Sequence, residues 1–130
     1  MSPTDHLEVA NLFARLSRAL DNHEALDQLY TKDAKVHSPR GGELDGFDAI
    51  TEYVRQTRIE DHTQHMNTDL LITLNGDEAQ ASANQLVHFY REGQPPHQTS
   101  GLRVSYTAVR TPEGWRFREA EIKLAWTRTS

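Results

Sequence analysis

Three tight-turn signals in the second half of the chain constrain its fold more than any other sequence feature. They divide residues 62–128 into four extended segments, which run over 62–74, 78–91, 97–110 and 115–128. The turns are Asn75-Gly76-Asp77, Glu92-Gly93-Gln94-Pro95-Pro96 and Thr111-Pro112-Glu113-Gly114. Because strands joined by tight turns pair with their chain neighbours in antiparallel fashion, the sequence predicts a four-stranded meander.

The first sixty residues carry helical patterns instead. A first helix, capped by Ser2 and broken at Asp21-Asn22-His23, is predicted from apolar residues that recur near a 3.6 period: Leu7, Val9, Leu12, Phe13, Leu16 and Leu20. A second, shorter helix is predicted over 24–30, followed by a short strand over 34–38 that ends at Pro39-Arg40-Gly41-Gly42. The third helix is predicted from Phe47 to about Glu60, with Gly46 or Asp48 as its cap.

This order of elements predicts an α+β fold in one domain over 1–130. Long antiparallel strands twist and curl, so three N-terminal helices laid across the sheet would leave a cone-shaped hollow. Such a hollow is the default place to expect a small-molecule ligand.

Composition excludes several classes of partner and site. The formal net charge of -5 and the lack of a Lys/Arg run argue against a nucleic-acid surface. The chain has no cysteine, which excludes disulfides and thiolate chemistry. Its longest apolar runs are triplets such as Leu70-Leu71-Ile72, and no signal peptide is visible. We therefore expect a soluble, cytoplasmic protein with no membrane or nucleic-acid partner.

The stretch from Asp61 to Ile72 begins as a polar segment and then becomes an apolar strand. A histidine on a strand can be held facing a cavity, and His65 is the candidate here. A neutral imidazole titrates near pH 6.5, so it can accept a proton, provided that a carboxylate orients the ring. Asp21, at the end of the first helical pattern, is the best candidate for that carboxylate.

Other residues are candidates for binding a substrate. Asn84, His88 and Tyr90 share one face of their predicted strand, and this polar row is either a solvated face or a pocket lining; we favour the lining. Trp126 is either a core residue or an apolar wall, and Phe13 and Tyr53 are core residues that would line the hollow. A metal site at His62 and His65 is disfavoured, since a spacing of three puts the rings on opposite faces of a strand.

The chain resembles the nuclear transport factor 2-like superfamily and, within it, the SnoaL-like proteins. The segments that carry the resemblance are 16–21 followed by 25–30, Asp33-Ala34-Lys35-Val36, Gly46-Phe47-Asp48-Ala49-Ile50, Thr63-Gln64-His65 and Gly114-Trp115-Arg116-Phe117. The pattern is most similar to the dehydratases and dehydrochlorinases of the superfamily, and the resemblance places Asp21 and His65 at the positions of their proton-abstracting pair. Two departures from scytalone dehydratase are evident. Tyr90 stands where a second histidine is expected, and Leu20 leaves the carbonyl-polarising tyrosine pair without a match.

The resemblance implies a cofactor-independent enzyme of the dehydratase, cyclase or isomerase type. Its substrate would be a small, apolar, cyclic or polyketide-like molecule, with no metal, and the protein would be a homodimer. In this reading Tyr90, Asn84 or His88 stabilises the developing oxyanion. Two alternatives stay open: a ligand-binding or accessory domain without chemistry in the same hollow, and a structural dimer module with a filled cone.

Overall fold

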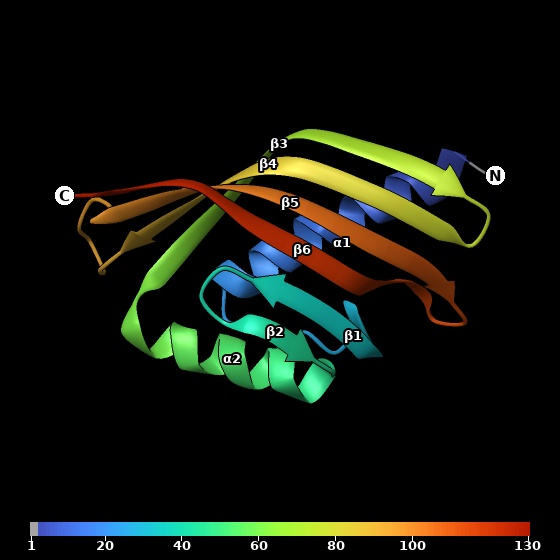
Figure 1. Ribbon diagram of the computed structural model, residues 1–130, viewed down its shortest axis with the longest axis horizontal. Helices are drawn as coiled ribbons and strands as arrows, with labels where there is room; N and C mark the ends of the chain where they lie inside the picture. The colour runs from blue at the N-terminus through green and yellow to red at the C-terminus, as the bar shows by residue number, and fades with distance from the viewer. Residues whose placement is uncertain (1–2) are drawn as a thin grey trace.

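The computed structural model describes residues 3–130, which form two helices and one six-stranded sheet (Figure 1). In chain order the elements are α1 (Pro3–Asp21), β1 (Tyr30–Ser38), β2 (Gly42–Asp45), α2 (Phe47–Glu60), β3 (His62–Asn75), β4 (Glu78–Tyr90), β5 (Gln98–Thr111) and β6 (Gly114–Thr129). The strand order is β2-β1-β6-β5-β4-β3, and every neighbouring pair is antiparallel except β1 and β6. The α+β class is confirmed.

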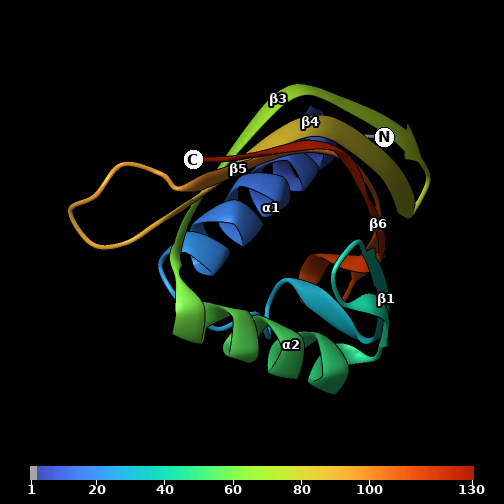
Figure 2. The same ribbon diagram turned by 60° about the vertical axis from the view of Figure 1, so that its left-hand side comes forward.

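The four long strands form the predicted meander, with each strand bonded to the next in the chain. The sheet arches over α1, while α2 lies on the far side of α1 from the arch, next to β1 (Figure 2). A register shift interrupts the pairing of β3 with β4 between Thr68 and Leu71, where Asp69 has a φ of 56°. Such bulges increase the local bend and twist of a strand.

The prediction of three N-terminal helices is wrong, because residues 24–30 form no helix. Leu26 and Leu29 are buried as the apolar pattern indicated, but the chain between them makes only a turn, closed by Leu29 N–H donating to the Leu26 carbonyl at 3.0 Å. Tyr30 then enters β1, where it pairs with Phe117 of β6. So short a segment cannot nucleate a stable helix alone, and sheet pairing competes for its last residue.

The glycine-rich segment after β1 turns the chain instead of only ending the strand. Residues 39–41 connect β1 to β2, and Ser38 pairs with Gly42 in an antiparallel hairpin. Gly46 then caps α2 with a φ of 95°, a conformation that disfavours any side chain. The predicted cap of α1, Ser2, lies outside the described residues.

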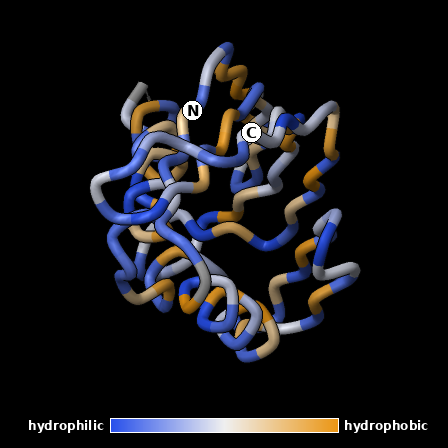
Figure 3. The backbone as a smooth tube through the Cα atoms, turned by 90° about the vertical axis from the view of Figure 1, so that its left-hand side faces the viewer, coloured by the Kyte–Doolittle hydropathy of each residue, from blue (hydrophilic) through white to orange (hydrophobic). Residues whose placement is uncertain are grey.

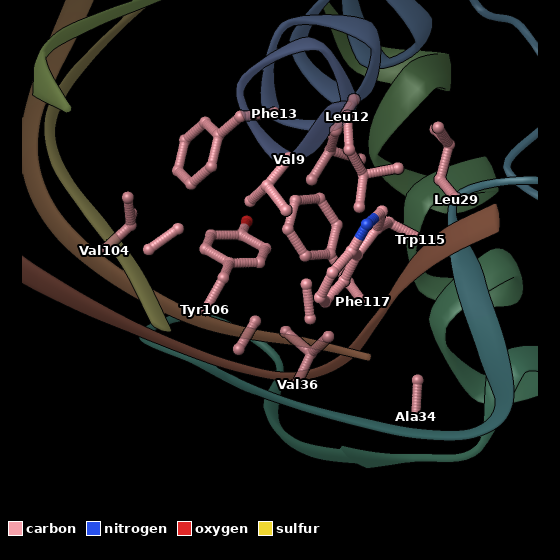
Figure 4. Close-up of a cluster of buried hydrophobic side chains, with 14 of the residues drawn as sticks. Val9, Leu12, Phe13, Leu29, Ala34, Val36, Val104, Tyr106, Trp115 and Phe117 are labelled. Atoms are coloured by element: carbon pink, nitrogen blue, oxygen red, sulfur yellow. The ribbon is translucent and has the colours of Figure 1, made fainter. Parts of the chain in front are cut away.

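The core lies between α1 and the concave face of the sheet (Figure 4). Val9, Leu12 and Phe13 of α1 are buried there, and the Phe13 ring packs edge-on against Tyr106 and Phe117, with centroids 5.0 and 5.8 Å away. Leu7, which was predicted to belong to the buried stripe, is 60% exposed. The carboxylate of Asp5 occupies the buried position one turn before Val9 instead.

Hydrophobic and hydrophilic residues alternate along the strands, as the colouring of Figure 3 shows. On β4 the buried set is Ala79, Ala81, Ala83, Gln85 and Val87. The residues between them face the outer side of the sheet. This alternation decides which side chains of β4 can reach the hollow.

Within residues 3–130, neither helix combines the length and the apolar composition needed to cross a bilayer.

Candidate functional site

A cavity of about 540 Å³ opens between α1, α2 and the concave face of the sheet. Its walls are mainly apolar, and both Phe13 and Tyr53 line it, as the sequence predicted. The polar groups among its lining include Ser17, His65 and Gln85. A cavity whose wall is mainly apolar but also carries polar side chains suits a small, mostly hydrophobic ligand with polar substituents.

Asp21 and His65 meet at the wall of this cavity. Asp21 is the last residue of α1, and His65 is the fourth residue of β3, with its ring against Asp21. The ring Nδ1 of His65 is 2.6 Å from Asp21 Oδ1, and the His65 backbone N–H donates to Asp21 Oδ2 at 2.8 Å. The Thr63 hydroxyl donates to Asp21 Oδ1 at 3.1 Å. One carboxylate therefore receives donors from both the backbone and the side chains of β3.

This geometry determines which ring nitrogen of His65 is available. When Nδ1–H donates to the carboxylate, Nε2 carries the lone pair of the neutral imidazole. No hydrogen bond within residues 3–130 engages Nε2. The His65 and Asp21 side chains are 13% and 19% exposed, so both are mostly shielded from water, and His65 lines the cavity while Asp21 lies behind it. The arrangement can accept a proton from a molecule in the cavity.

A chain of polar side chains runs beside this pair, and our sequence reasoning missed it. The Gln85 amide donates to Asn67 Oδ1 at 2.8 Å, and the Asn67 amide donates to the Ser17 hydroxyl oxygen at 2.8 Å. Ser17 and Gln85 are each 8% exposed. A signal for it exists in the sequence, since Ser17 lies four residues before Asp21 on the helix and Asn67 lies two residues after His65 on the strand.

The prediction that Asn84, His88 and Tyr90 line the hollow is wrong. All three lie on the outer face of β4, where Asn84 bonds Asp69 at 3.0 Å, His88 bonds Thr99 at 2.8 Å and Tyr90 stacks on His62. The alternate residues Gln85, Val87 and Phe89 line the cavity. Alternation separates two faces but does not say which one is inside, and the mainly apolar face, with Gln85 as its polar exception, packs inward.

Trp126 also lies outside the cavity lining, so its predicted role as an apolar wall is not supported. It pairs with Gly101 of β5 and remains 49% exposed. A Cβ atom at residue 101 would come within 2.3 Å of the indole ring. The ring thus covers the glycine on the outer face of the sheet.

Arg58 of α2 holds the end of α1 in place at the cavity wall. One of its guanidinium nitrogens donates to the carbonyl oxygens of both Ala19 and Glu24, each at 2.9 Å. Burial lowers the pKa of this guanidinium. Because Ala19 and Glu24 flank Asp21, these two bonds stabilise the position of its carboxylate.

Two tyrosines, Tyr30 and Tyr106, also contribute to the lining. Burial raises the pKa of both phenols, and for Tyr30 the contact with Tyr106 raises it further. They present neutral groups to the cavity across the neutral pH range.

Comparison with known proteins agrees with this architecture. The family model described as a SnoaL-like domain matches residues 2–121. No curated protein matches the chain. A Novosphingobium aromaticivorans protein provisionally named a scytalone dehydratase superposes with a TM-score of 0.88 at 18% identity, covering 98% of this chain and 88% of that one.

Two further solved structures are similar. An NTF2-like protein with a cystatin-like fold, also from Novosphingobium aromaticivorans, has 27% identity and a TM-score of 0.77, with 94% of this chain and 82% of that chain covered. A type 2 hexachlorocyclohexane dehydrochlorinase has 14% identity and a TM-score of 0.85, with coverages of 99% and 93%. The family model matches nearly the whole length of the chain, and the curved sheet with its two helices agrees with the solved structures. This chain belongs to the family of SnoaL-like domain proteins, on the NTF2-like, cystatin-like fold.

Proposed function

We propose that the protein is a cofactor-independent enzyme of the dehydratase, cyclase or isomerase type, in which His65 removes a proton from an apolar cyclic or polyketide-like substrate. The observation that carries the proposal is the 2.6 Å contact of His65 Nδ1 with Asp21, which leaves Nε2 unbonded within residues 3–130, on a histidine that lines a cavity of about 540 Å³. A ring held in this way needs no reorientation before it accepts a proton.

The chemistry follows from the roles of the two residues. Nε2 takes a proton from carbon or oxygen, and the Asp21 carboxylate stabilises the imidazolium that forms. In a dehydration, the electron pair of the broken C–H bond moves toward an adjacent carbonyl oxygen. The carbonyl then re-forms, and the enolate pair becomes the new C=C bond as the C–O bond to the neighbouring hydroxyl breaks; the imidazolium gives its proton to that hydroxyl, which leaves as water. In an isomerisation the enolate takes the proton back at another carbon, and in a ring closure the enolate carbon bonds to a second carbonyl carbon, whose oxygen takes the proton.

The cavity walls support an apolar substrate. Phe13, Leu16 and Leu102 lie among the lining residues, and such groups gain free energy by covering a flat hydrocarbon. Exclusion of water around the substrate strengthens the interaction between the imidazolium and its carboxylate. The proposal therefore assigns binding to the apolar walls and proton transfer to one polar corner.

Proton abstraction can be tested without knowing the physiological substrate. A panel of bicyclic ketones and hydroxyketones, 2-tetralone among them, is incubated with the protein in deuterated water, and exchange at the carbon beside the carbonyl is followed by NMR. We expect the wild type to accelerate exchange for at least one compound. His65→Ala should lose at least ~100-fold of that rate, whereas His37→Ala, which removes an exposed histidine from β1, should retain it.

Full activity in His65→Ala would refute the assignment of the base. If the protein instead retains a compound from the panel tightly and returns it unchanged after long incubation, the ligand-binding alternative replaces the enzymatic one.

A further inference from the structure

The polar chain Gln85–Asn67–Ser17 has an orientation, because each member donates to the next. The Gln85 amide donates to the Asn67 carbonyl oxygen, and the Asn67 amide donates to Ser17 Oγ. Ser17 Oγ is thereby occupied as an acceptor. Its own proton has no acceptor among residues 3–130, although a helical serine commonly donates to the carbonyl one turn earlier.

The position of Ser17 makes its hydroxyl proton available to a molecule in the cavity. The side chain is 8% exposed, and it belongs to the lining of the same cavity as His65. Ser17 precedes Asp21 by four residues on α1, and Asn67 follows His65 by two on β3, so the two bonded pairs lie side by side along the helix–strand contact. A donor and a proton acceptor therefore face one region of the cavity from adjacent positions.

The chain also strengthens the donor. In a medium of low dielectric constant, hydrogen bonds arranged head to tail polarise one another. A hydroxyl whose oxygen accepts from an amide becomes a better donor through its proton. Gln85 and Asn67 thus both hold Ser17 in place and polarise it.

We propose that Ser17 donates a hydrogen bond to the substrate oxygen on which negative charge develops, with Asn67 and Gln85 as positioning residues. The substrate class follows from this: a carbonyl compound whose acidic C–H lies beside the carbonyl carbon, so that His65 takes the proton and Ser17 binds the enolate oxygen. When the C–H bond breaks, its electron pair forms the C=C bond of the enolate, and the carbonyl π electrons move to oxygen. This inference rests on the proposed function for the identity of the base.

The donor can be tested by binding alone, so that no proton abstraction is needed. The probe is 2-naphthol in mildly alkaline buffer, where neutral and ionised forms coexist and are told apart by their fluorescence. The ionised oxygen stands for the enolate oxygen. We expect the wild type to bind the ionised form preferentially and Ser17→Ala to weaken that binding by at least ~10-fold, the range for a hydrogen bond to a charged group.

Matched variants separate the hydroxyl from a general effect on packing. Ser17→Thr keeps a hydroxyl and should retain preference for the ionised probe, while Ser105→Ala removes an exposed serine on β5 and should leave binding unchanged. Asn67→Leu should reduce the preference, and adding Ser17→Ala to it should cost less than Ser17→Ala alone, since both act through one donor. Circular dichroism checks that each variant is folded.

Three outcomes would overturn the proposal: no binding of the probe by the wild type, equal affinity of Ser17→Ala, or an equal loss in Ser105→Ala. Its failure is distinct from that of the proposed base. If His65→Ala keeps its exchange activity but Ser17→Ala loses probe affinity, the base assignment fails and the donor stands; the reverse pattern leaves the base and removes the donor.

Discussion

Asp21 holds His65 at two points: its Oδ2 accepts the His65 backbone N–H at 2.8 Å, and its Oδ1 lies 2.6 Å from Nδ1 of the ring. The backbone contact places the last residue of α1 against β3, and the ring contact then orients the imidazole. The two contacts are made by different oxygens of one carboxylate. A substitution that preserves the shape of Asp21 can therefore separate its structural role from its chemical one.

We expect Asp21→Asn to lower the proton-exchange rate by at least ~100-fold. The asparagine oxygen can still accept the His65 backbone N–H, but its amide nitrogen would face the ring and favour the tautomer with the proton on Nε2. That tautomer cannot act as a base toward the cavity. Asp27→Asn, at an exposed position before β1, serves as the control. An active Asp21→Asn protein would show that the carboxylate has only a structural role.

Removal of Arg110 should destabilise the protein, because it pairs with the buried Asp5. Arg110 donates to both oxygens of Asp5 at 2.8 and 2.7 Å, and Asp5 is 6% exposed. We expect Arg110→Leu to lower the melting temperature by roughly 5 °C or more. Arg55→Leu breaks only an exposed pair with Glu52 and should change the melting temperature by less than about 2 °C. Equal melting curves for the two variants would contradict this ranking.

Alkaline pH should destabilise the fold through Tyr30 and Tyr106. Burial raises the pKa of both phenols above the ordinary value of 10.0. A group whose pKa is raised in the folded state contributes stability below its unfolded pKa and loses it as the pH rises. The free energy of unfolding should therefore fall above about pH 10, by up to ~1.4 kcal/mol per pH unit for each tyrosine.

Denaturant unfolding at a series of pH values measures this loss. Tyr106→Phe removes one of the two titrating groups and should make the decline shallower. Constant stability through the alkaline range, together with ionisation of every tyrosine in the folded protein near its ordinary pKa, would contradict the prediction.

The outer face of the sheet predicts that the protein forms a homodimer. Met66, Leu86, Gly101 and Trp126 are consecutive cross-strand partners on β3 to β6, and Met66 and Trp126 are 46% and 49% exposed. An apolar row of this kind gains free energy when a second copy covers it. We expect sedimentation at micromolar protein to give a dimer for the wild type and a monomer for Trp126→Glu. Ile59→Glu, at an exposed position of α2, is the control, and a monomeric wild type would contradict the prediction.

Patterns within short stretches of sequence correctly predicted the turns between the long strands and the buried face of α1, because both depend mainly on residues close together in the chain. Turn residues such as Gly76 and Gly114 restrict where a strand can end, and both have positive φ angles. The helical period over Val9, Leu12 and Phe13 likewise predicted the buried face of α1. The helix predicted over residues 24–30 was wrong, because apolar spacing indicates which residues are buried and not their backbone conformation. That conformation was determined by the pairing of Tyr30 with β6.

The sequence by itself determined the two faces of each strand, the class of fold and, through the resemblance, the pairing of Asp21 with His65. Only the tertiary structure decided which face of β4 is inside, and therefore that Gln85 and not Asn84 reaches the cavity. It also joined Ser17, Asn67 and Gln85 into one chain. The physical reason is that periodicity is a property of one segment. A chain of hydrogen bonds that links α1, β3 and β4 exists only once the sheet has curled over the helix.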